Sequence, residues 1–166
     1  MLPNHDQCCI YFPTVLHGPL GKGNTLNTEY TQCKALGEAL VTKTAKKVKD
    51  NLASFSGKGK VDLVLVTHAA EDTKVGGGSW LYTPKHEASA LAQRILSDIG
   101  EDNLKKVNIW LWVCQAGMSG VGAAFRTAIS KETVKKIYAP HQDIAGVGLF
   151  LKHLDVGGSE SFAEVR

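Results

Sequence analysis

The chain has 166 residues, of which 43% are hydrophobic and 21% charged, and its formal net charge is +3. This is the size and composition of one folded domain, so a disordered tail, a collagen-like repeat and a disulfide-dense scaffold are excluded. No apolar run approaches the roughly 18–20 residues that span a bilayer. The four cysteines show neither metal-ligand nor disulfide spacing. We expect a cytoplasmic protein with reduced thiols, or an effector delivered into another cell without a classical signal.

The apolar pattern alternates between strand and helix spacing. Residues 8–12 form a short apolar run that predicts a strand, and apolar residues at steps of three and four predict one amphipathic helix over 28–55. Residues 61–68 and 107–114 are apolar on both faces, which is typical of central parallel strands covered by helices. Alternation along the second of these strands puts Trp110, Trp112 and Cys114 on one face.

The remaining elements follow the same alternation. Thr83 and Pro84 mark the start of a helix that ends before Gly100, because a capping hydroxyl precedes proline at the first helical position. A further helix is predicted around residues 121–129, a strand over 135–140 and a weaker helix over 144–154. This order predicts a three-layer α/β/α sandwich with a mostly parallel central sheet, formed as a single α/β domain over residues 1–166.

Two reactive residues end the two doubly buried strands. His68 is the last residue of the first strand and Cys114 the last of the second. Ligands of open parallel sheets bind outside the carboxyl ends of the strands, and neighbouring strands lie about 4.8 Å apart. If the strands are adjacent, an imidazole and a thiol can meet there as proton acceptor and nucleophile. A core cysteine and a solvated histidine are the structural alternative.

The same two blocks resemble the double signature of the caspase–gingipain–clostripain superfamily of cysteine peptidases. That signature is an apolar run before a histidine and, further along the chain, an apolar run before a cysteine. This chain has two similar blocks, LVLVTH ending at His68 and IWLWVCQAG around Cys114. WLYTPKHEASALAQRIL, between them, resembles a helix in the self-processing protease domains of large bacterial toxins. The resemblance covers residues 61–140 and implies a caspase-like form of a Rossmann-like sandwich.

The resemblance implies a cysteine endopeptidase that acts on a peptide or protein substrate without metal or cofactor. Cys114 would attack the scissile carbonyl, His68 would protonate the leaving amine, and the backbone N–H groups of Ala69 and Cys114 would hold the oxyanion. Two features depart from the family. Ala69 stands where the family nearly always has glycine, and the chain has room for only one strand–helix unit before the histidine strand, where the family usually has another.

The stretch after the last predicted strand is expected to form one wall of the substrate pocket. The residues assigned to this wall are Ala139, Pro140, His141 and Asp143. Asp143 could favour a basic residue before the cut. It suits a helix N-cap equally well, so both roles stay open.

A lysine-rich stretch covers residues 43–60, with six lysines against one aspartate. In the toxin domains that the chain resembles, inositol hexakisphosphate binds a basic surface, so the resemblance implies a polyanion at Lys43, Lys46, Lys47 and Lys49. The alternative is a solvated helix face whose lysines complement the dipole at the helix C-terminus. We expect neither nucleic acid nor membrane as a partner.

Two functions other than peptidase stay open. One is a non-catalytic α/β module that binds a nucleotide or another anion over the strand ends, with glycines at 76–78 and 117–122 supplying backbone donors. The other is an inactive peptidase relative that acts through protein contacts. Thiol reactivity distinguishes them, because only the peptidase requires Cys114 to be far more reactive than the other cysteines.

Overall fold

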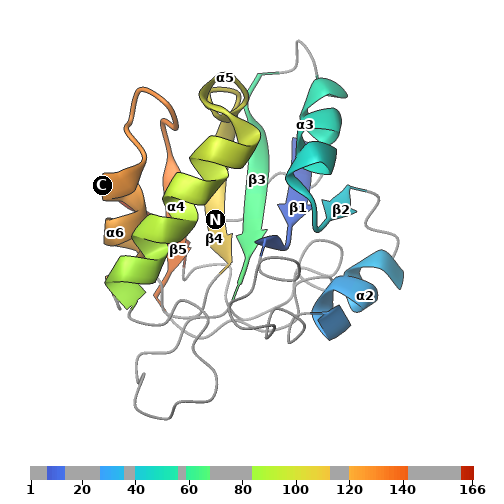
Figure 1. Ribbon diagram of the computed structural model, residues 1–166, viewed down its shortest axis with the longest axis horizontal. Coiled ribbons are helices and arrows are strands. Elements are labelled where there is room, and N and C mark those ends of the chain that lie inside the picture. Colours follow the sequence, from blue (N-terminus) through green and yellow to red (C-terminus); the bar gives the residue numbers. More distant parts are fainter. Residues whose placement is uncertain are drawn as a thin grey trace.

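The computed structural model describes residues 7–13, 27–35, 40–55, 59–67, 84–112, 120–141 and 162–166. Its strands form one six-stranded sheet in the order β2-β1-β3-β4-β5-β6 (Figure 1). The strands are β1 (Cys8–Tyr11), β2 (Val41–Thr42), β3 (Val61–Val66), β4 (Val107–Trp112), β5 (Ile137–Pro140) and β6 (Phe162–Glu164). The first five run parallel and β6 runs antiparallel to β5. The predicted mostly parallel sheet is therefore confirmed.

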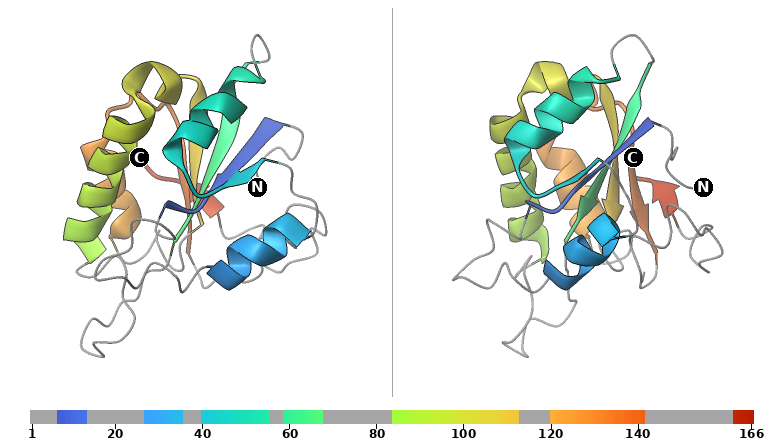
Figure 2. Two further views of the ribbon diagram at one scale, coloured as in Figure 1. Left: turned by 45° about the vertical axis from the view of Figure 1, so that its right-hand side comes forward. Right: turned by 90° about the vertical axis from the view of Figure 1, so that its right-hand side faces the viewer.

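Helices pack against both faces of this sheet. They are α2 (Asn27–Ala35), α3 (Ala45–Ala53), α4 (Pro84–Ile99), α5 (Glu101–Leu104) and α6 (Val121–Ala128). Helices α3 to α6 bury their apolar residues on one face, whereas Cys33 of α2 joins the apolar cluster on the other. Figure 2 shows α3, α4 and α6 on the same side of the sheet. The fold is thus mixed α/β, with a central sheet between helices.

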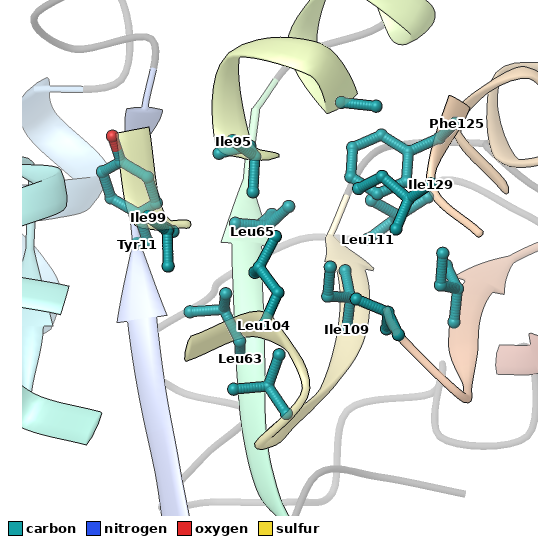
Figure 3. Close-up of a cluster of buried hydrophobic side chains, with 14 of the residues drawn as sticks. Tyr11, Leu63, Leu65, Ile95, Ile99, Leu104, Ile109, Leu111, Phe125 and Ile129 are labelled. Atoms are coloured by element: carbon teal, nitrogen blue, oxygen red, sulfur yellow. The ribbon is translucent and has the colours of Figure 1, made fainter. Parts of the chain in front are cut away.

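The larger apolar cluster fixes the two central strands. Leu63 and Leu65 of β3 and Leu111 of β4 are fully buried against Ile95 of α4 and Phe125 of α6 (Figure 3). Each such side chain contributes about 1.5–3 kcal/mol on burial. This packing holds the carboxyl ends of β3 and β4 in a defined place.

The opposite face of the central strands is aromatic. Trp110 stacks on Tyr138 with ring centroids 4.1 Å apart, and Trp112 stacks on Phe162 of β6 at 4.9 Å. Ile109 and Leu111 belong to the other cluster, so the predicted alternation of β4 is confirmed for the residues described.

The single helix predicted over 28–55 is wrong. The chain forms α2, then the short strand β2, then α3, because Val41 and Thr42 pair with β1. Thr44 is extended (φ −124°, ψ 139°), and its hydroxyl accepts from the N–H of Lys47 at 3.3 Å, which begins α3. Two strand–helix units therefore precede β3, where the sequence predicted one.

The other predicted elements within the described residues agree with the structure or differ from it only at their ends. α4 has the predicted bounds, and Gly100 after it has φ 90° and donates its N–H to Leu96 O at 3.0 Å. The strand predicted over 135–140 is β5, the helix predicted over 144–154 lies outside the described residues, and α5 and β6 were not predicted. None of the helices in the described ranges is long and apolar enough to cross a membrane.

Candidate functional site

The carboxyl ends of β3 and β4 lie side by side in the middle of the sheet. Six residue pairs join the strands in parallel, from Val61↔Val107 to Val66↔Trp112. Beyond the last pair, the N–H of Thr67 donates to Trp112 O at 3.3 Å. The expectation that the two doubly buried strands are neighbours is therefore confirmed.

The predicted catalytic residues His68, Ala69 and Cys114 lie outside the described residues, as does Asp143. The described residues closest to the first three in sequence are Thr67 and Trp112, which are 3% and 5% exposed. The structure therefore defines the strands that lead to the predicted dyad.

Helix α6 begins at the same edge of the sheet. Its N-cap, Gly120, is left-handed (φ 82°, ψ −4°), a conformation that favours glycine, and no side chain caps it among the described residues. The first hydrogen bond along the helix runs from the N–H of Ala124 to Gly120 O at 3.0 Å. The N–H groups of residues 121–123 thus lack intrahelical acceptors, and this terminus carries partial positive charge.

Two buried hydroxyls lie where β1 and β3 end. The hydroxyls of Tyr11 and Thr67 have no hydrogen-bond partner among the described residues. Burial and, to a smaller extent, the charge of Asp98 raise the pKa of Tyr11 to about 12, against the opposing charge of Arg94. Strand order reverses between β1 and β3, which is where doubly wound sheets bind ligands. No pattern in the sequence marks this pair, because only the pairing of β1 with β3 brings the two residues to one place.

Strand β5 ends beside β4. The pairs Ile109↔Ile137 and Trp110↔Tyr138 set its register, and His141, the residue after the strand, is exposed. Ala139 is 1% exposed and packs in the cluster shared with α6, whereas Pro140 is buried and pairs with Phe162 of β6. Of the predicted pocket residues that the structure describes, His141 is the one open to solvent.

The lysines of residues 43–60 divide between two ends of the fold. Lys43 precedes α3 and its Nζ lies 5.3 Å from the ring centroid of Tyr30, while Lys46 and Lys47 are exposed in the first turn of α3. The expectation that such lysines complement a helix C-terminus is therefore wrong for Lys46 and Lys47, because cations oppose the dipole at an N-terminus. Lys60 lies before β3 and donates to the backbone carbonyl of Lys105.

The described cysteines are all buried. Cys8, Cys9 and Cys33 are 6%, 0% and 0% exposed, and burial raises the pKa of the Cys9 thiol to about 12. These three thiols are poor nucleophiles, because the reactive form is an accessible thiolate. Within the described ranges no three His, Cys, Asp or Glu side chains gather to hold a metal ion.

Comparison with known proteins finds no family model, no curated protein and no solved structure that matches this chain. The features that bear on a functional site are therefore those of the sheet itself. Its carboxyl edge combines two adjacent central strands, the positively polarised start of α6 and an exposed histidine after β5.

Proposed function

We propose that this protein is a cysteine peptidase with a His68/Cys114 dyad on a caspase-like form of the α/β sandwich. The observation that carries the proposal is the register of β3 and β4. Val66 pairs with Trp112, and these residues are 46 positions apart in sequence, as are His68 and Cys114. Continuation of the parallel ladder by two residues would bring the imidazole-bearing and thiol-bearing residues together.

The proposed reaction is hydrolysis of an amide bond through an acyl-enzyme. The Cys114 thiolate attacks the carbonyl carbon, and the backbone N–H groups of Ala69 and Cys114 stabilise the oxyanion by roughly 3–4 kcal/mol per donor. His68 protonates the departing amine. It then takes a proton from the water that hydrolyses the thioester, which regenerates the free thiol. The partial positive charge at the N-terminus of α6 would favour the thiolate of Cys114 over the neutral thiol.

Two described features support this assignment. Two strand–helix units precede β3, as the resembling superfamily usually has, and helix α6 starts seven residues after Cys114. The three other cysteines are buried, so they offer no rival nucleophile on the described surface.

Selective alkylation is the first test. We expect iodoacetamide near neutral pH to modify Cys114 much faster than Cys8, Cys9 and Cys33, measured by peptide mass spectrometry over time. The variant His68→Ala should slow alkylation of Cys114, because it loses the imidazolium that stabilises the thiolate. Equally slow modification of all four cysteines would remove the basis of the peptidase assignment.

Cleavage of a peptide library is the second test. Cys114→Ala and His68→Ala should each abolish turnover while the far-ultraviolet circular dichroism stays unchanged. Cys9→Ala is the matched control, because its thiol is buried in the apolar cluster on the other face of the sheet from Trp112, and it should keep turnover. Full activity of Cys114→Ala would show that the thiol is not the nucleophile.

A second candidate function is binding of a nucleotide or another anion over the strand ends. The buried hydroxyls of Tyr11 and Thr67 favour it, since both lie beside the switch point of the sheet and lack partners among the described residues. Melting curves with a nucleotide panel test it. A ligand that raises Tm in the wild type but not in Tyr11→Phe would support this function, and no shift with any nucleotide would exclude nucleotides as its ligand.

A further inference from the structure

The edge of the sheet opposite the proposed dyad carries a cation on each of four neighbouring strands. Lys60, Lys106 and Lys136 directly precede the first residues of β3, β4 and β5. Arg166 follows β6, whose antiparallel direction brings its end to this same edge. All four residues are exposed. We call them the basic edge.

The pairing of the strands sets the spacing of the basic edge. Val61 pairs with Val107, so Lys60 stands next to Lys106, and Tyr138 pairs with Glu164, so Lys136 stands next to Arg166. Adjacent strands are about 4.8 Å apart, so the four strands span about 15 Å. Ile109 pairs with Ile137, so Lys136 lies level with Asn108, two residues or about 6.6 Å further into the sheet than Lys106. The row therefore has a step between β4 and β5. Backbone hydrogen bonds hold the row: Val61 N–H donates to Lys106 O at 2.9 Å, and Ile109 N–H donates to Lys136 O at 3.0 Å.

Nearby carboxylates only partly offset this charge. Asp62 and Glu164 lie two residues further into the sheet from Lys60 and Arg166, about 6.6 Å along a strand. Glu101 lies 3.6 Å from the Nζ of Lys105, and Asp102 belongs to α5. Between α6 and β5, the exposed Lys131 and Lys135 outnumber the exposed Glu132. The positions just before β3, β4 and β5 and just after β6 therefore keep a net positive charge.

We propose that the basic edge binds the phosphate backbone of single-stranded nucleic acid. The charges form a stepped row across four strands, which a flexible chain with one negative charge per nucleotide can follow. Three of the four cations are lysines, which act as point charges on phosphate. Trp110 and Tyr138, the nearest aromatic residues on these strands, are buried, so stacking on bases does not contribute. Binding is consequently independent of base identity.

This surface arises only from folding, because its members are separated by 30 or more positions in sequence. The expectation of no nucleic-acid partner came from the sequence, in which these four cations form no cluster. It lies at the amino ends of the strands, and β3 and β4 have six residues each, so about 20 Å separates it from the carboxyl edge. The inference is therefore independent of the proposed peptidase function.

Fluorescence anisotropy with a labelled oligothymidylate of about twelve nucleotides tests the proposal. We expect a Kd of roughly 10⁻⁴–10⁻⁶ M near physiological salt, and four phosphate contacts give a slope of log K against log salt of about −2.8. The double variant Lys106→Ala/Lys136→Ala should reduce the slope to about −1.4. Lys34→Ala/Arg94→Ala is the matched control, because it removes two exposed cations on α2 and α4, outside both the basic edge and the lysine-rich stretch, and should leave the slope unchanged.

Folding of each variant is checked by circular dichroism, and oligoadenylate should bind within about threefold of oligothymidylate, because only phosphate is contacted. The proposal is wrong if neither oligonucleotide binds at low salt, if the folded double variant retains the wild-type slope, or if the control loses as much affinity. Tighter binding to anionic lipid vesicles or to polyglutamate than to the oligonucleotide would also overturn it and assign the edge to a membrane surface or an acidic peptide.

Discussion

Arg126 is a buried cation whose replacement tests how α6 is held in the fold. Its side chain is 6% exposed, and Nη2 donates to the carbonyl of Ile129 at 2.7 Å and to that of Val134 at 2.8 Å. Burial lowers the pKa of the guanidinium, and the charge of Glu164 opposes this shift. Nη1 is buried without a partner among the described residues. The two bonds tie the end of α6 to the loop that leads into β5.

Replacing Arg126 with methionine should lower the free energy of unfolding by about 2–4 kcal/mol. Two hydrogen bonds from a charged donor contribute about 1.5–3 kcal/mol each, and their loss leaves two buried carbonyls unpaired. The loss is partly offset, because methionine has no buried unpartnered nitrogen, whose burial costs about 1–3 kcal/mol in the wild type. For a chain of this size a net loss of about 3 kcal/mol lowers Tm by roughly 6–12 °C.

Urea unfolding followed by tryptophan fluorescence measures this change, because Trp110 and Trp112 are buried in the folded state. The control is Thr127→Ala on the same helix, which is exposed and should change stability by no more than about 0.5 kcal/mol. A loss below about 1 kcal/mol in Arg126→Met would refute the reasoning, since the two carbonyl bonds would then contribute little.

Four further predictions concern described residues. Thr44→Ala should lower the free energy of unfolding by about 1 kcal/mol, because it removes the N-cap of α3, and a variant as stable as the wild type would contradict the cap. Lys46→Glu should raise the free energy of unfolding by about 0.3–1 kcal/mol, because it places an anion at the start of the helix. Thermal melting measures both changes. Tyr11→Phe should leave stability unchanged or slightly higher, because it removes a buried hydroxyl without a partner among the described residues, and a loss above about 1 kcal/mol in urea would show that the hydroxyl is bonded. Stability should fall as pH rises from 9.0 towards about 12, because the unfolded chain releases the Cys9 proton and the folded chain keeps it. Cys9→Ala should flatten this fall by up to about 1.4 kcal/mol per pH unit, and an identical slope in both proteins would exclude Cys9 as its source.

The sequence by itself determined the longer helices and strands, because the residues within each segment show one consistent pattern of apolar residues or capping residues. The bounds of α4 follow from Pro84 at its first position and Gly100 after its end, and both lie where the sequence analysis placed them. β3 and β4 were predicted because their residues are apolar on both faces, a property that each segment carries by itself. The candidate dyad could be named for the same reason, since His68 and Cys114 follow these two runs directly in sequence.

Tertiary structure decided the short strands and every pairing. Val41 and Thr42 fit the helical spacing of residues 28–55 and become β2 only because β1 offers hydrogen bonds beside them. Phe162 belongs to a strand because β5 pairs with it, and the hydroxyls of Tyr11 and Thr67 and the cations of the basic edge are brought together by the order of the strands. Side-chain periodicity is a property of one segment, whereas strand pairing is a hydrogen-bonding choice between distant segments. A short strand buries too few side chains to leave a period of its own, so its sequence does not specify the partner.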